Sequence, residues 1–297
     1  MDKNKEKILT SKIVKELCLD RVSVITADIL KGYTKIGDHA FESCSNLASI
    51  DIPNSVTNIG RGAFYGCHSL TSVIIPTSVT NIGDDVFEYC SSLTSVTIPN
   101  SIISIGYEAF MGCSSLISID IPNSVTSIGS WAFSCCSSLT SVTIPDSVTV
   151  IGYGAFYDCN SLTSVIIPDS VTHIDKFSFY ACCFKHENKT DKQGRIIAYK
   201  GFNADMTCLD FQYKEGETYK IEYTPVLCKY GFHACLNPLD CLNYYSGQIG
   251  KDVVFHEVYL EGVPAEKYDD SKVVAKKITI GREITLSEMA DIASGRK

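Results

Sequence analysis

Four residues in the C-terminal third of the chain have side-chain types that bind zinc. They follow the spacing Cys-x4-His-x-Cys-x5-Cys and are Cys228, His233, Cys235 and Cys241. Zinc takes thiolate and imidazole ligands in a tetrahedron, and structural sites commonly contain a Cys-x2-Cys pair. No such pair occurs here. The set is a candidate metal site, and ordinary buried thiols are the alternative interpretation.

The same segment offers a cysteine nucleophile with a histidine base. Cys228 or Cys235 is the candidate nucleophile, and His233 or His256 is the candidate base. Such a thiol needs an adjacent base to react as the thiolate. The spacing brings none of these pairs together, so the sequence favours a protein that is not a cysteine enzyme.

A third set of residues is recognised by its order along the chain. Tyr-Lys-Gly at 199–201 is followed by Gly-Phe-His-Ala at 231–234 and a strand-like run at 253–260. This order resembles the nicotinamide-site elements of ADP-ribosyltransferases. The candidate catalytic residues that the resemblance implies are Lys200, His233, Tyr244 and Glu257, with Glu283 as the alternative to Glu257. That chemistry commonly uses His or Arg where Lys200 stands, so the resemblance implies a related fold and leaves an enzyme as an alternative function.

Large aromatic side chains in the first two thirds of the chain are candidates for binding a partner protein. They are Tyr65, Tyr89, Tyr107, Trp131, Tyr153 and Tyr157. Tyrosine and tryptophan are enriched among the residues that dominate binding energy. The alternative is that these rings only cover the corners of a repeated structure.

These aromatic residues belong to a 23-residue repeat that runs from 36 to 184. The repeat is close to Ile-Gly-x-x-Ala-Phe-x-x-Cys-Ser-Ser-Leu-Thr-Ser-Val-x-Ile-Pro-x-Ser-Val-Thr-x. A period of this length with Leu-x-x-Val-x-Ile spacing is typical of leucine-rich coils, in which each repeat supplies a short parallel strand. We therefore predict a mixed fold class: a β-rich parallel solenoid, with Phe, Ile and Cys buried in line, followed by a small α+β domain.

Each position of the repeat has an expected role. Proline, as in Pro76, ends the strand because it has no N–H to donate. Ser78 satisfies backbone groups of the turn that follows. Gly83 provides conformational freedom at the second corner, and the Ala-Phe step (Val86-Phe87 in this coil) begins a short helical turn.

The repeat closely resembles the BspA-like leucine-rich repeats of bacteria and protists. The resemblance covers about half of the chain. Members of that family are often surface adhesins or interaction proteins, which implies a protein partner. Because the N-terminus has no evident export signal, we expect a cytoplasmic protein, or a cell-surface one if a leader has been removed.

The flanks of the repeat predict a cap and a separate domain. Residues 1–35 are predicted to form an N-terminal cap with an amphipathic helix near 5–17. Residues 185–297 lose the period and predict the α+β domain, with strand-like runs at 196–199, 218–223, 231–235, 253–260 and 272–280. Helices are expected after Asn237, with Pro238 in the first position, and after Thr285, with Glu288 completing a capping box.

The sequence of the C-terminal part also resembles a domain of unknown function found in bacterial and phage proteins. The segments that carry the resemblance include Leu-Cys-Lys-Tyr-Gly-Phe-His-Ala-Cys-Leu-Asn-Pro-Leu-Asp-Cys and Phe-His-Glu-Val-Tyr-Leu-Glu-Gly, and they span nearly all of 196–292. The resemblance implies an identity for the domain and no chemistry.

Charge and hydropathy restrict the partners. Residues 36–184 carry two basic and twelve acidic side chains, a net charge of −10, which repels phosphate backbones and excludes nucleic acid as an expected partner. No apolar run reaches the roughly 18 residues of a membrane span. The sequence therefore favours a non-enzymatic scaffold that binds a protein, with the C-terminal domain as a second recognition module. No cofactor is expected, and the sequence leaves the oligomeric state open.

Overall fold

The computed structural model describes residues 7–17, 19–184, 189–208, 211–222, 232–245, 247–263 and 271–296. The chain divides into two compact units. The first comprises Met1–Leu162 with Ser178–Cys183, and the second comprises Thr163–Phe177 with Phe184–Lys297. The first unit is a parallel β-solenoid and the second is built on an antiparallel sheet, so the predicted fold class is confirmed.

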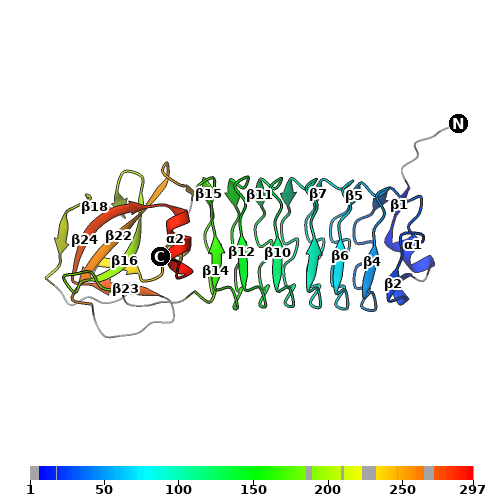
Figure 1. Ribbon diagram of the computed structural model, residues 1–297, viewed down its shortest axis with the longest axis horizontal. Helices are drawn as coiled ribbons and strands as arrows, with labels where there is room; N and C mark the ends of the chain where they lie inside the picture. Colours follow the sequence, from blue (N-terminus) through cyan, green and yellow to red (C-terminus); the bar gives the residue numbers. More distant parts are fainter. Residues whose placement is uncertain are drawn as a thin grey trace. The chain divides into compact units, whose positions relative to one another are not determined.

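Each coil of the first unit contributes two short strands to two rows of parallel strands (Figure 1). The first row contains β4 (Ser49–Asp51), β6 (Ser72–Ile74), β8 (Ser95–Thr97), β10 (Ser118–Asp120) and β12 (Ser141–Thr143). The second row contains β3 (Lys35–Ile36), β5 (Asn58–Ile59), β7 (Asn81–Ile82), β9 (Ser104–Ile105), β11 (Ser127–Ile128) and β13 (Val150–Ile151). Paired residues are one repeat apart, as in Ser49 with Ser72 and Ser72 with Ser95. Equivalent residues therefore lie side by side.

The solenoid core is a column of identical side chains. Consecutive phenylalanine rings from Phe41 to Phe179 stack with centroids 5.3–5.4 Å apart. The repeated cysteine lies beside this column, and its thiol donates to a phenylalanine carbonyl, as Cys90 Sγ does to Phe64 O at 3.2 Å. Burial raises the pKa of Cys90 to about 12, so the thiol stays neutral. The predicted alignment of Phe, Ile and Cys is confirmed.

The serine after the proline has the predicted role in four coils, whereas Ser124 Oγ is buried without a hydrogen-bond partner among the described residues. Ser55, Ser101 and Ser147 each donate from Oγ to a backbone carbonyl 22 residues earlier, at 2.6–2.9 Å, and Ser78 bonds in the same way to Val56 O. These hydroxyl bonds join one coil to the preceding one.

The turn around Ala-Phe is not helical, and that prediction was wrong. Two residues per turn have left-handed backbone angles, such as Asp85 with φ +58° and Tyr89 with φ +56°. Their backbone N–H groups donate to the next coil, Asp85 N to Tyr107 O at 2.9 Å and Tyr89 N to Met111 O at 2.7 Å. Bonding between coils replaces the bonding within a helix that the sequence suggested.

The repeated glycine has a different role from the one predicted. Gly106 does not have a positive φ, so conformational freedom is not the reason for it. A Cβ atom at Gly106 would lie 2.6 Å from the backbone carbon of Gly83. Glycine is therefore needed there because adjacent coils approach closely.

The N-terminal residues continue the two rows of strands. β1 (Ile8–Leu9) pairs with β3, and β2 (Val24–Ile25) pairs with β4, both in parallel. Between them lie α1 (Ser11–Glu16), which Thr10 caps, and the short 3-10 helix η1 (Leu19–Arg21). A helix lies in the predicted region and is shorter than expected, and the cap itself stays a prediction. Within the described residues, no helix is long and apolar enough to cross a membrane.

The second unit contains a six-stranded antiparallel sheet in the order β19-β24-β22-β16-β20-β23. These strands are β16 (Ile196–Asn203), β19 (Thr218–Lys220), β20 (Phe232–Cys235), β22 (Val253–Glu261), β23 (Lys272–Ala275) and β24 (Lys277–Ile284). A small hairpin joins β17 (Thr207–Cys208) and β18 (Phe211–Gln212). The single strand expected at 272–280 is two strands, because β23 pairs with β20 whereas β24 pairs with β22.

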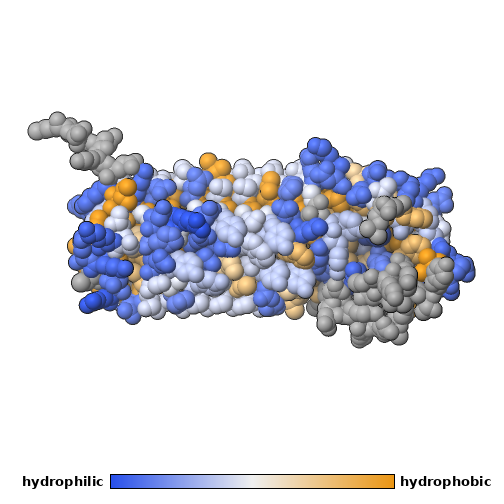
Figure 2. All heavy atoms as spheres, turned by 180° about the vertical axis from the view of Figure 1, so that it is seen from behind, coloured by the Kyte–Doolittle hydropathy of each residue, from blue (hydrophilic) through white to orange (hydrophobic). Residues whose placement is uncertain are grey.

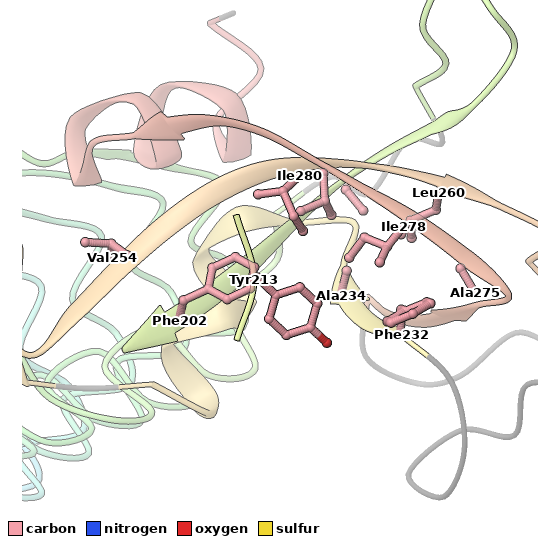
Figure 3. Close-up of a cluster of buried hydrophobic side chains, with 11 residues drawn as sticks. Phe202, Tyr213, Phe232, Ala234, Val254, Leu260, Ala275, Ile278 and Ile280 are labelled. Atoms are coloured by element: carbon pink, nitrogen blue, oxygen red, sulfur yellow. The ribbon is translucent and has the colours of Figure 1, made fainter. Parts of the chain in front are cut away.

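The two faces of this sheet are covered differently. One face carries a hydrophobic cluster that includes Phe202, Tyr213 and Phe232 (Figure 3). The 3-10 helix η2 (Pro238–Asn243), capped by Asn237 as predicted, covers the other face. The ring of Tyr245 there occupies the space that a Cβ of Gly201 would take.

The last repeat strands belong to the second unit. Helix α2 (Leu286–Ala293) has the predicted capping box of Thr285 and Glu288, and it packs against β14 (Ser164–Ile166). β15 (His173–Ile174) pairs antiparallel with β21 (Gly247–Gln248). The boundaries predicted at 35 and 184 stay a prediction.

Candidate functional site

The six aromatic residues predicted to bind a partner all lie in the turns on one edge of the coils. Five of them form two groups of rings in contact, and Tyr107 belongs to neither. Tyr65 meets Tyr89 edge to face with centroids 5.8 Å apart. Trp131 meets Tyr153 at 5.1 Å and Tyr157 at 5.2 Å. We call these six residues, together with Tyr180 described next, the aromatic edge.

Tyr180 was missed by the sequence analysis. Its ring stacks on that of Tyr157 with centroids 5.2 Å apart. The signal was available, because Tyr180 follows Tyr157 by one repeat.

Glycines in the next coil create room for two of these rings. A Cβ at Gly112 would lie 2.5 Å from the ring of Tyr89, and a Cβ at Gly154 would lie 2.6 Å from the ring of Trp131. Both glycines have positive φ. The rings are therefore held in place by packing. Side chains that are already ordered lose less conformational entropy when a partner binds.

The aromatic edge is partly open to solvent. Tyr89, Tyr107 and Tyr153 are 39%, 42% and 36% exposed, whereas Trp131 and Tyr157 are half-buried. On the face shown in Figure 2, hydrophobic residues of the coils form small patches among weakly polar ones. The aromatic edge thus contains rings that are fixed by packing and still partly exposed to solvent, such as that of Tyr89.

Three carboxylates beside the first aromatic group form a cluster that the sequence analysis did not predict. One carboxylate oxygen from each of Asp85, Glu88 and Glu108 lies within 4.8 Å of the others. Asp85 Oδ2 accepts a hydrogen bond from Arg61 Nε at 2.7 Å. The available signal was the spacing, since Glu88 is three residues and Glu108 one repeat beyond Asp85.

Burial and mutual repulsion disfavour the ionised forms of these carboxylates. Burial, and then the charges of Glu108 and Asp85, raise the pKa of Glu88 to about 7. A hydrogen bond to Glu108, together with burial, raises the pKa of Tyr107 to about 12. Asp85 Oδ1 is buried and has no hydrogen-bond partner among the described residues.

The four candidate catalytic residues are not brought into one site. Lys200 pairs with His256 and Tyr199 pairs with Glu257, so Lys200 and Glu257 point to opposite faces of the sheet. Lys200 is buried on the face of the hydrophobic cluster, and its Nζ donates to the backbone oxygen of His233 at 3.1 Å.

The other two candidates have contacts of their own. The His233 side chain lies on the face opposite to Lys200. Tyr244 follows the end of η2, and the Lys272 ammonium lies 4.2 Å from its ring centroid. Glu257 Oε1 accepts a hydrogen bond from Tyr259 at 2.5 Å.

The candidate zinc ligands are placed only in part. His233 and Cys235 lie on one face of β20, and Cys241 is buried in η2. Cys228 lies outside the described residues. In the described part of the chain, these side chains do not form a group of three ligand atoms close enough to share an ion.

A shallow hollow lies on the other side of the coils, over the strands β10 and β12. Its polar lining includes Ser118, Asp120, Asn123, Ser141 and Thr143. These are mostly the small polar residues expected on the strand face. No aromatic residue or arginine lines it.

Comparison with protein families finds two matches. A family described as BspA type leucine-rich repeat region matches residues 11–103 and 80–205, with six copies. A family described as domain of unknown function (DUF7666) matches residues 196–292. No curated protein matches the sequence.

Several solved structures are similar to the chain. A leucine-rich repeat protein from Bacteroides ovatus is 39% identical over 50% of this chain and 38% of its own, with a TM-score of 0.48. One from T. pallidum is 32% identical over 49% of this chain and 69% of its own, with a TM-score of 0.47. One from Eubacterium ventriosum is 25% identical over 58% of this chain and 47% of its own, with a TM-score of 0.50. The chain thus spans less than half the length of the first and third.

Proposed function

This chain belongs to the family of BspA-type leucine-rich repeat proteins, and from that premise we propose that it is a non-enzymatic scaffold that binds a partner protein through the aromatic edge. The observation that carries the proposal is the gathering of Trp131, Tyr153, Tyr157 and Tyr180 into one packed group with exposed rings. Rigid aromatic side chains bury a large area on binding at a small entropic cost.

The strand face is a weaker candidate for the same role. Its hollow is lined by small polar side chains such as Ser141 and Thr143. Such residues are under-represented among the side chains that dominate binding energy. The net charge of −10 over 36–184 favours a protein partner over a nucleic acid.

The second unit acts in this proposal as another recognition module. Its domain family brings no assigned chemistry. The enzyme alternative needs Lys200 and a carboxylate in one cleft. The pairing of β16 with β22 puts Glu257 on the face opposite to Lys200. The other candidate, Glu283, pairs with His256 on the face of Lys200, but it is exposed, whereas Lys200 is buried with its Nζ bonded to His233 O. The proposal therefore keeps binding as the role of both units.

The location of the protein is part of the proposal. The described cysteines are free thiols, which is typical of the reducing cytoplasm that we expected from the sequence. The surface-adhesin alternative is supported by the resemblance to a family with many surface members. Protease treatment of intact cells separates the two locations, because only a surface protein is cleaved before lysis.

The binding proposal is tested by changing exposed rings in the full chain. The variant Tyr89→Ala with Tyr153→Ala removes one exposed ring from each aromatic group. We expect the affinity for the captured partner to fall about 30-fold or more, because the loss of even one hot-spot residue costs about 2 kcal/mol. The measurement is affinity capture with quantitative mass spectrometry, followed by a titration with the purified partner.

The matched control is Ile74→Ala with Ile117→Ala, which truncates two exposed side chains, one in β6 and one just before β10. Circular dichroism melting verifies that both double variants are folded. The proposal fails if the control variant loses the partner and the tyrosine variant retains it.

A further inference from the structure

We propose that Asp85, Glu88 and Glu108 form a binding site for a calcium ion on the edge of the coils. The site adjoins the aromatic edge, because Tyr107 bonds to Glu108, but ion binding is a different function from the proposed partner binding and goes beyond it. All three donors are carboxylates, and calcium takes six to eight oxygen ligands in irregular geometry. No other group of three potential metal-ligating side chains within this reach occurs in the described part of the chain.

Two of the three carboxylates are buried, and Arg61 compensates only one oxygen of one of them. Asp85 and Glu88 are 5% and 7% exposed. Asp85 Oδ1 has no hydrogen-bond partner, and the Glu88 side chain makes no hydrogen bond or salt bridge with any described residue. A buried charge without a partner is strongly destabilising. Both groups point at the same small region, where a cation would satisfy them together.

The charge that remains after Arg61 is counted matches a divalent ion. Arg61 is the one cationic side chain within salt-bridge distance of the cluster in the described residues, and it bonds to Asp85 Oδ2. With all three carboxylates ionised, as a bound cation would keep them, the carboxylates and one guanidinium leave a formal charge of −2. Because the Arg61 bond uses Oδ2, Asp85 Oδ1 stays available as a ligand.

The spacing of the oxygens also fits calcium. Ligand oxygens lie about 2.3–2.6 Å from a bound calcium, so two of them can be as far as about 5 Å apart. The three carboxylate oxygens lie within 4.8 Å of one another. Magnesium binds at about 2.0–2.1 Å in a strict octahedron and usually keeps several waters, so it is a poorer match for this set.

The backbone holds the three carboxylates in this arrangement. Asp85 N donates to Tyr107 O at 2.9 Å, Glu108 N to Ser130 O at 3.0 Å and Glu88 N to Asp85 O at 3.1 Å. Asp85 and Glu108 occupy equivalent left-handed positions in adjacent coils, with φ +58° and +52°. The donors are therefore fixed by the ladder between coils, and half-buried Glu108 gives the ion access from solvent.

The test is a calcium titration of the full chain after removal of metal with a chelator. Calorimetry is expected to show one equivalent of bound calcium, and the melting temperature of the first unit is expected to rise. Terbium, which replaces calcium in oxygen sites, is expected to luminesce on tyrosine excitation because Tyr107 bonds to Glu108. No heat, no shift in melting and no terbium emission would overturn the proposal.

The diagnostic variant is Glu88→Gln, and the matched control is Asp51→Asn. Both remove one negative charge from the first unit, but Asp51 is exposed on β4. We expect Glu88→Gln to weaken calcium binding by at least about tenfold, as loss of a ligand-shell group does, and Asp51→Asn to leave it unchanged.

The melting temperature gives a second readout with the opposite sign. Without calcium, Glu88→Gln is expected to melt at or above the wild-type temperature, because it removes one of three clustered charges. With calcium, the wild type is expected to be the more stable protein. Equal loss of calcium binding in both variants would show that the effect is net charge alone and would overturn the site.

Discussion

The two units of the chain build their hydrophobic cores in different ways. In the coils, Phe64 lies between Phe41 and Phe87 with ring centroids 5.3 and 5.4 Å away, so each ring contacts copies of itself. In the second unit, Phe202 packs against Tyr213 at 5.2 Å and His256 at 5.6 Å. The first core repeats one contact, whereas the second combines different residue types from different strands.

This difference has a consequence for stability. In a solenoid, each repeat contacts only its neighbours, so the stability is approximately a sum of equivalent interfaces. Equivalent substitutions in different coils should then have equal effects. In the second unit, each core position has its own neighbours, and no such equivalence is expected.

The largest expected effect is the loss of a stacked phenylalanine. Phe110→Ala removes a fully buried ring between two others and should lower the free energy of unfolding by about 3–5 kcal/mol. Phe64→Ala should cost the same to within about 0.5 kcal/mol, because its surroundings are the same. Urea unfolding followed by the fluorescence of Trp131, the one tryptophan of the chain, measures the first unit.

The control for this prediction lies in the second unit. Phe202→Ala also removes a fully buried ring, but it should leave the Trp131 transition in place because it lies outside the first unit. A difference above about 1.5 kcal/mol between the two coil variants would contradict the equivalence of the interfaces.

A smaller effect is expected where two coils approach most closely. In Gly106→Ala, the new Cβ would meet the Gly83 backbone at 2.6 Å, so the coils would have to separate, at a cost of about 1–3 kcal/mol. Gly83→Ala is the matched substitution, since its nearest non-bonded atoms would be 3.7 Å away. The same fluorescence measurement should find the Gly83 variant nearly as stable as wild type. Equal costs would argue against close approach as the reason for this glycine.

The coils could be predicted well from the sequence, because residues 23 positions apart are neighbours in adjacent coils. Once Phe87 is known to lie between Phe64 and Phe110, burial and stacking follow. The turn after each Ala-Phe step was predicted wrongly for a local reason. Asp85 and Tyr89 adopt left-handed angles that favour glycine, and hydrogen bonds to the next coil hold them there. Those bonds depend on the stack and not on the local sequence.

The candidate sites, too, could be predicted only where the repeat period determines which residues are neighbours. Aromatic residues on a repeated turn could be predicted to lie on one edge, and they do. The carboxylate cluster depends on side-chain directions at left-handed positions in two coils, which the sequence does not specify. In the second unit, the pairing of Lys200 with His256 decides which candidates share a face, and which strands pair depends on the tertiary fold, in which β16 lies between β22 and β20.

The smallest of these effects concerns the end of the coils, where the neighbour is no longer a copy. In the second unit, Arg296 Nη2 donates to Val165 O at 2.6 Å and Nη1 to Ser164 Oγ at 2.9 Å. Arg296→Ala should destabilise β14 by about 1 kcal/mol and speed hydrogen exchange of the Val165 amide about fivefold.

Arg282→Ala is the control for this last change, because Arg282 is more exposed and forms an ion pair with Glu288 at 3.0 Å. Exposed pairs contribute little, so exchange at Val165 should not change. Equal exchange in both variants would mean that the Arg296 bonds do not protect Val165, and that the Ser294 hydroxyl, which bonds to Val165 N and O, and apolar contact hold α2 on β14. A difference would show that the Arg296 hydrogen bonds stabilise β14. Such specific bonds are needed there because α2 does not carry the side chains that adjacent coils stack against one another.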